Sequence, residues 1–112
     1  MNTYTVGLTE RAEVDADDIF LRYNRSVPDQ GDRWQAGFVK ALASLSSLPN
    51  RCPVAREDAR YAGVVVRRFL FGKYRILFHV IELGESETEG SVRVIRVIHG
   101  SRATEQEEKD DD

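Results

Sequence analysis

Three side chains that could bind an anion, Arg68, Arg75 and His79, fall on one side of a predicted β-hairpin. Its turn is Gly72-Lys73, a two-residue sequence with glycine at the first central position, which is typical of antiparallel strands. Side chains alternate along a strand, so the turn predicts which residues share a face. A guanidinium group binds phosphate or carboxylate through two parallel hydrogen bonds. This arrangement therefore favours an anionic partner.

The two faces of this hairpin differ in character. The more aromatic face should pack on helices, and it carries Val65, Arg67, Phe69, Phe71, Tyr74, Ile76, Phe78 and Val80. The other should be open, and it carries Val64, Val66, Arg68, Leu70, Arg75, Leu77, His79 and Ile81. Across the hairpin, the predicted pairs are Arg68 with Leu77, Leu70 with Arg75, and Val66 with His79. The alternative is a solvated face, since cations on an exposed strand also prevent unwanted edge pairing.

The elements that position these residues belong to a single domain, because 112 residues suffice for one core and not for two. No apolar stretch approaches the ~20 residues of a membrane-spanning helix. Residues 1–9 lack the features of a signal peptide. Cys52 is the only cysteine, and we interpret it as a small apolar loop residue. We therefore expect a cytoplasmic protein that needs no cofactor and no metal.

The net charge of −3 conceals strong local asymmetry. Residues 51–80 contain seven arginines and lysines against two acids, whereas residues 105–112 contain six acids against one lysine. The basic stretch again indicates an anionic partner. Nothing apolar follows Ala103, so the sequence predicts one domain over residues 1–103 and an acidic, disordered tail over residues 104–112.

Hydrophobic periodicity gives the order of the elements. Residues 3–8 alternate as a strand, Thr9 suits a helix N-cap, and a proline ends the first helix after residue 25. A second helix should run from about Asp29 to Pro49, with a core stripe of Trp34, Phe38, Leu42, Leu45 and Leu48. Residues 50–63 lack periodicity and indicate a loop, and strands are expected at residues 64–71, 74–83 and 92–98. The prediction is a two-layer α+β fold, with two helices on one face of a mostly antiparallel four-stranded sheet.

Several segments together resemble one protein family. Residues 66–78, with Tyr74-Arg75-Ile76, are similar to the central hairpin of RelE/ParE toxins. Residues 94–102 resemble the last strand of that family and its His-Gly-x-Arg ending. The opening, Tyr4-x-Val6-x-Leu8-Thr9-x-x-Ala12-x-x-Asp15, resembles the first strand and the start of the first helix. The resemblance covers about residues 3–102 and implies the same β-α-α-β-β-β fold.

The resemblance implies a toxin of a type II toxin–antitoxin pair, often described as a plasmid stabilisation protein. Such a toxin is neutralised by a cognate antitoxin. ParE-like members poison DNA gyrase without chemistry of their own. RelE-like members are mRNA endonucleases that cut messages in the ribosomal A site. A toxin fold that has lost its toxicity is a third alternative.

In the nuclease alternative, the resemblance implies that Arg75 and His99 are catalytic, with Arg68 assisting. They would stabilise the phosphorane charge and transfer protons without a metal. Residues expected to contact the target or the RNA are Arg67, Lys73, Arg93, Arg96 and Arg102. However, no aromatic residue follows His99, and the lysine-rich segment of ribosome-dependent members is missing. These departures favour the ParE-like alternative.

Overall fold

The computed structural model describes residues 3–47, 49–83 and 89–100, and its elements follow the predicted β-α-α-β-β-β order. They are β1 (Thr3–Leu8), α1 (Glu10–Ser26), α2 (Gln30–Ser44), β2 (Arg67–Phe71), β3 (Tyr74–Glu82) and β4 (Glu89–His99). Two short 3-10 helices, η1 (Pro49–Arg51) and η2 (Arg56–Arg60), lie between α2 and β2. The predicted tail of residues 104–112 lies outside the described residues.

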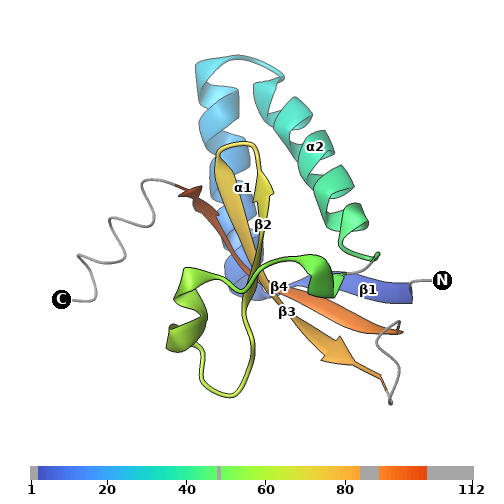
Figure 1. The fold of residues 1–112 in the computed structure, drawn as a ribbon. Coiled ribbons are helices and arrows are strands. Elements are labelled where there is room, and N and C mark those ends of the chain that lie inside the picture. The colour runs from blue at the N-terminus through green and yellow to red at the C-terminus, as the bar shows by residue number, and fades with distance from the viewer. Residues whose placement is uncertain (1–2, 48, 84–88, 101–112) are drawn as a thin grey trace.

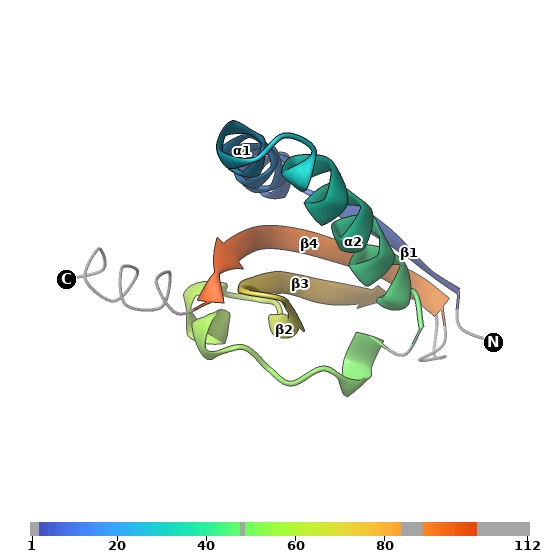
Figure 2. The same cartoon turned by 90° about the horizontal axis from the view of Figure 1, so that it is seen from above.

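The four strands form one sheet in the order β1-β4-β3-β2. β1 and β4 are parallel, whereas β4–β3 and β3–β2 are antiparallel. Figures 1 and 2 show both helices on one face of this sheet and the segment of residues 49–66 on the other. We call residues 49–66 the cover segment. The predicted α+β class is confirmed, and the cover segment adds to it a partial third layer.

α1 begins and ends where local chemistry predicts, whereas α2 ends at Ser44, before the predicted end at Pro49. Thr9 is the N-cap of α1, and its side-chain oxygen accepts a hydrogen bond from the N–H of Ala12 at 3.2 Å. Gly31 lies where α2 approaches α1, and a Cβ atom there would lie 2.5 Å from the carbonyl oxygen of Phe20. Only glycine therefore permits this contact. Neither described helix is long and apolar enough to cross a membrane.

The main core lies between the helices and the first sheet face. As predicted, the aromatic side of the hairpin packs there, with Tyr74, Ile76 and Phe78 buried. Phe38 is buried as well, and its ring stacks on Trp34 with centroids 4.9 Å apart. Trp34 itself and Leu42 are half-buried. Leu48 lies outside the described residues, and Leu45 is fully buried just beyond the end of α2.

The cover segment changes two predicted elements. The region of residues 50–63, predicted as a loop, contains η1 and η2. β2 begins at Arg67 and not at Val64, because the backbone of Val66 bonds to Asp58 and Ala55 within the cover segment. Its N–H donates to Asp58 Oδ1 at 2.7 Å, and its carbonyl accepts from Ala55 at 2.8 Å. The predicted pair of Val66 with His79 is therefore absent from the ladder.

Candidate functional site

The hairpin register places the predicted cationic residues on the sheet face that points away from the helices. Arg68 pairs with Leu77 and Leu70 pairs with Arg75, as the turn predicts. Arg68 and Arg75 are therefore diagonal neighbours on one face, within reach of each other's long side chains. His79 lies further along β3 on the same face, by strand alternation. The predicted division of the hairpin residues between the two sheet faces is therefore confirmed.

This face is not open at Arg75, which corrects the prediction. Arg75 is only 4% exposed, because η2 lies over it and supplies Glu57. The Nη1 atom of Arg75 lies 2.5 Å from Oε2 of Glu57, and its Nη2 atom lies 2.9 Å from Oε1. The pair neutralises both charges within a small apolar cluster, so neither group is buried unpaired. That cluster comprises Ala55, Val66, Leu77 and Ile98, with Tyr61 and Ile95 packed against it.

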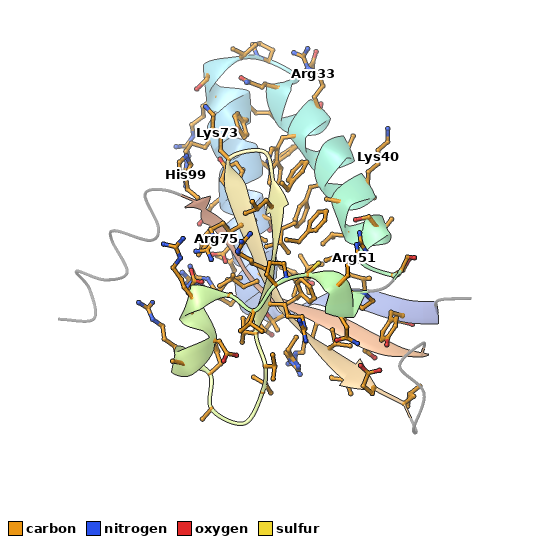
Figure 3. The ribbon with its side chains drawn as sticks, in the orientation of Figure 1. Arg33, Lys40, Arg51, Lys73, Arg75 and His99 are labelled. Carbon is orange, nitrogen blue, oxygen red and sulfur yellow. The ribbon has the colours of Figure 1, made fainter. Side chains whose placement is uncertain are left out.

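His99 lies on the opposite face from Arg75. It pairs with Tyr74 across β3 and β4, and their rings meet edge to face with centroids 5.6 Å apart. Directly paired residues share a face, and that of Tyr74 packs against the helices. The N–H of Gly100 donates to the carbonyl of Lys73 at 2.7 Å, which fixes this end of β4 against the hairpin turn (Figure 3). The structure therefore does not bring Arg75 and His99 together.

Two other predicted contact residues have internal partners. Arg96 donates through Nε to Oδ2 of Asp15 on α1, at 2.8 Å. The same oxygen accepts the backbone N–H of Val97 at 2.9 Å, beside a bulge in the β3–β4 ladder. Arg67 donates through Nη1 to the carbonyl of Cys52 at 2.7 Å. These two arginines hold α1 and the cover segment against the sheet.

The remaining predicted contact residues are accessible or lie outside the described part of the chain. Lys73 is exposed in the hairpin turn, and Arg93 is exposed on β4. Arg93 lies directly opposite His79, on the face away from the helices. Burial and the charge of Arg93 lower the pKa of His79 below its ordinary value, which favours the neutral imidazole. Arg102 lies outside the described residues.

Sequence reasoning missed the two acids that organise this region. Glu57 lies in a segment without periodicity, and nothing in its neighbours signals a buried partner for an arginine of β3. Asp15 belongs to the quoted opening motif, and its position on the apolar stripe of α1 is a usable signal. A carboxylate on a buried helix face requires a partner. Asp15 finds that partner in Arg96.

Burial also shifts the pKa values of two groups in the main core cluster, Tyr74 and Cys52. Desolvation and a hydrogen bond with Tyr23 raise the pKa of Tyr74 to about 12. Burial raises the pKa of the Cys52 thiol, against the opposing effect of nearby arginines. Cys52 is therefore an inert, buried thiol, in agreement with its interpretation as a small apolar residue. Neither group is prepared for catalysis near neutral pH.

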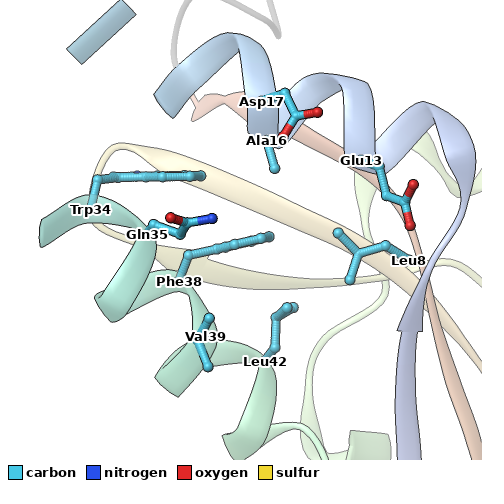
Figure 4. Close-up of a pocket in the computed structure, with 9 residues that line it drawn as sticks. All are labelled: Leu8, Glu13, Ala16, Asp17, Trp34, Gln35, Phe38, Val39 and Leu42. Atoms are coloured by element: carbon cyan, nitrogen blue, oxygen red, sulfur yellow. The ribbon is translucent and has the colours of Figure 1, made fainter. Parts of the chain in front are cut away.

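A groove of about 250 Å³ lies between α1 and α2 (Figure 4). Trp34, Phe38 and Leu42 of α2 give it an apolar wall, and Glu13 and Asp17 of α1 stand at its other side. We call it the interhelical groove. Apolar side chains with acids at one rim suit an amphipathic segment that carries basic residues. The lining residues are Leu8, Glu13, Ala16, Asp17, Trp34, Gln35, Phe38, Val39 and Leu42.

Comparison with known proteins agrees with this fold. The family model described as "ParE toxin of type II toxin-antitoxin system, parDE" matches residues 6–104. A solved structure described as "Chromosomal ParDE TA system from P. aeruginosa" has a similar fold, with a TM-score of 0.65 and 17% sequence identity. The similarity covers 87% of this chain and 96% of that one. Curated protein sequences give no significant match. Because the family model spans almost the whole described fold, the chain belongs to the ParE toxin family of type II toxin–antitoxin systems.

Proposed function

We propose that this protein inhibits growth in the cytoplasm by binding DNA gyrase, without chemistry of its own, and that a cognate antitoxin neutralises it. Membership of the ParE toxin family supports the role of a toxin. One observation supports a binding mechanism over RNA cleavage. Arg75 is buried with Glu57 on one sheet face, while His99 lies on the other face against Tyr74. General acid–base catalysis requires these groups within hydrogen-bonding reach of one substrate.

The proposal is tested by expressing the chain in cells that lack the antitoxin. We expect growth arrest with DNA damage signalling, and ribosome profiling should show no cleavage of messages at the A site. In parallel, the purified chain should inhibit supercoiling of plasmid DNA by purified gyrase. Cleavage of messages at the A site, with gyrase unaffected, would contradict the proposal and support the RelE-like mechanism.

We further propose that the antitoxin occupies the interhelical groove with one face of an amphipathic helix. Its apolar side chains would contact Phe38 and Leu42, and basic residues would face Glu13 and Asp17. To keep the toxin inactive, the whole interface should bury well over about 1,000 Å². A groove of this size therefore holds only the centre of the contact, and a longer antitoxin segment must extend along the helices.

Val39 offers a direct test of the groove. It lines the groove yet is 59% exposed, so Val39→Glu adds a charge there without removing a core contact. We expect weaker co-purification with the antitoxin and growth inhibition that the antitoxin no longer relieves. Lys40→Glu is the matched control, because Lys40 is the exposed neighbour and does not line the groove. If both variants bound the antitoxin as tightly as the unmodified chain does, the groove would be excluded as the antitoxin site.

A further inference from the structure

The basic stretch of residues 51–80 is only partly explained by contacts within the fold. Three of its arginines have internal acceptors. Arg75 pairs with Glu57, Arg67 donates to the carbonyl of Cys52, and Arg51 donates to the carbonyl of Ser47. The charge of the stretch indicated an anionic partner, and the cations left exposed show where such a partner would bind.

Three exposed cations of this stretch lie at one end of the sheet. Arg56 and Arg60 flank Glu57 on η2, and Lys73 lies in the hairpin turn. We call these three residues the basic end. Of the two acids in the same stretch, Glu57 is neutralised by Arg75, and Asp58 accepts the backbone N–H of Val66. The basic end therefore keeps an excess of positive charge.

The chain leaves the sheet at the basic end. Gly100 is the last described residue of the C-terminal side, and its N–H donates to the carbonyl of Lys73 at 2.7 Å. A Cβ atom built on Gly100 would lie 3.5 Å from Cγ of Arg75, the arginine that holds η2 through Glu57. Figure 3 shows Lys73, Arg75 and His99 on one side of the molecule and Lys40 on the other. Residues 101–112 therefore start between the hairpin turn and η2.

These residues carry the opposite charge. Residues 105–112 contain six acids against one lysine. Residue 105 is five residues from Gly100, so it lies within about 17 Å of it even in a fully extended chain. A short covalent connection gives a binding segment an effective concentration in the roughly millimolar range. Single exposed ion pairs are weak, but several tethered carboxylates act together on the basic end.

We propose that the basic end binds the acidic residues 105–112 of the same chain. The occupant is identified by its charge and by the point at which it leaves the sheet. Contact through side-chain charges requires no regular structure in this segment. The inference goes beyond the toxin role and does not depend on the target. It makes the anionic partner of the basic stretch an intramolecular one, with which nucleic acid and other polyanions must compete.

The test uses the two lysines outside the acidic segment, Lys73 and Lys40, which are both exposed. A zero-length carbodiimide reagent joins a lysine amine to a carboxylate in direct contact. At low salt, peptide mass spectrometry should find residues 105–112 joined to Lys73 at least about tenfold more often than to Lys40. About 1 M salt should abolish the Lys73 product, because it shortens the range of charge interactions to about 3 Å. The product should form within single chains at every dilution.

A tethered segment also meets Lys73 by chance, so a matched pair of charge variants provides the control. Arg56→Glu should lower the yield at Lys73 at least about threefold, because it reverses one charge of the basic end. Arg33→Glu makes the same change at an exposed position of α2 and should leave the yield unchanged. Equal yields in Arg56→Glu and the unmodified chain would overturn the proposal, as would equal yields at Lys73 and Lys40 or a product formed only between two chains.

A second measurement leaves the folded part of the chain unaltered. The six acids of residues 105–112 are replaced by their amides, glutamate by glutamine and aspartate by asparagine. At low salt, the backbone amide signals of residues 56–60 and 72–75 should then shift in NMR spectra, and at about 1 M salt the two proteins should give the same signals. Unchanged signals at low salt, or shifts confined to the helices, would overturn the proposal.

Discussion

Glu57 and Arg75, one on η2 and the other on β3, form a two-pronged ion pair in which both residues are at least 96% buried. The pair fastens the cover segment to the sheet beside an apolar cluster. Arginine in this position therefore stabilises the fold. Loss of toxicity in Arg75→Ala would not identify Arg75 as a contact or catalytic residue, because the substitution leaves Glu57 buried without its partner.

Removing one partner of the Glu57–Arg75 pair should lower the stability of the folded protein. We expect Glu57→Ala to reduce the free energy of unfolding by about 3–5 kcal/mol, since it removes the carboxylate that neutralises a buried guanidinium. The double variant Glu57→Leu/Arg75→Met replaces the pair with apolar groups and should unfold close to the unmodified chain. Denaturant unfolding measures both. A loss below about 1 kcal/mol in the single variant would mean that water reaches the pair.

Phe38 should be a principal contributor to the main core. It is 4% exposed, stacks on Trp34 and contacts the cluster between α2 and the sheet. Truncation of Phe38 to alanine should cost about 3–5 kcal/mol, as do other large-to-small substitutions in protein cores. Thermal and denaturant unfolding provide the measurement. Val39→Ala, at the exposed neighbouring position, is the control and should change stability by less than about 0.5 kcal/mol.

His99→Gln separates the two mechanisms of toxicity. Glutamine retains hydrogen-bonding capacity but does not transfer protons, and a general acid or base contributes about 10²–10⁴-fold in rate. Because His99 and Arg75 lie on opposite faces, we expect growth inhibition to be largely retained. A melting curve verifies the fold, since His99 contacts Tyr74. Toxicity that collapses while the melting curve is unchanged would instead support a nuclease.

The acid side of the stability profile should depend on His79. Burial and Arg93 lower its pKa in the folded protein below the ordinary value of 6.5. The unfolded chain then binds the proton more readily, so stability is lost as the pH falls from about 6.5 through the folded pKa. Replacing His79 with glutamine should reduce the drop in denaturation midpoint between about pH 7 and pH 5. Identical pH profiles for the two proteins would contradict this assignment.

Local signals predicted the parts of the fold that are determined by neighbouring residues. The turn at Gly72-Lys73 and strand alternation gave the correct pairing and the correct packing face, and Thr9 gave the correct start of α1. Residues 50–63 of the cover segment were predicted as a plain loop and residues 64–66 as strand, because the contacts of this segment join residues far apart in the chain. The N–H of Val66 is bonded to Asp58 and so does not extend β2. No periodicity in the sequence records such a bond.

The candidate site was predicted less well, for two physical reasons. The alternation rule gives the face on which Arg75 lies but not what covers it, and Glu57 had no visible role. The last strand is a nearly continuous apolar run with arginines, which conceals its bulge. That bulge turns Arg96 towards Asp15 while Ile95 packs on the opposite face. Simple alternation from Val94 therefore misplaces Val97 and Ile98, which follow the bulge.

The position of β4 between β1 and β3 has a consequence for synthesis. Of the four described strands β4 is made last, so β1 has no neighbour in the sheet until residues 89–99 have left the ribosome. Pairings between such distant segments also fold slowly, because long loops must close first. The nascent chain therefore lacks the completed sheet throughout most of the synthesis of this domain. An antitoxin that is already present gains this interval to meet the toxin as it folds.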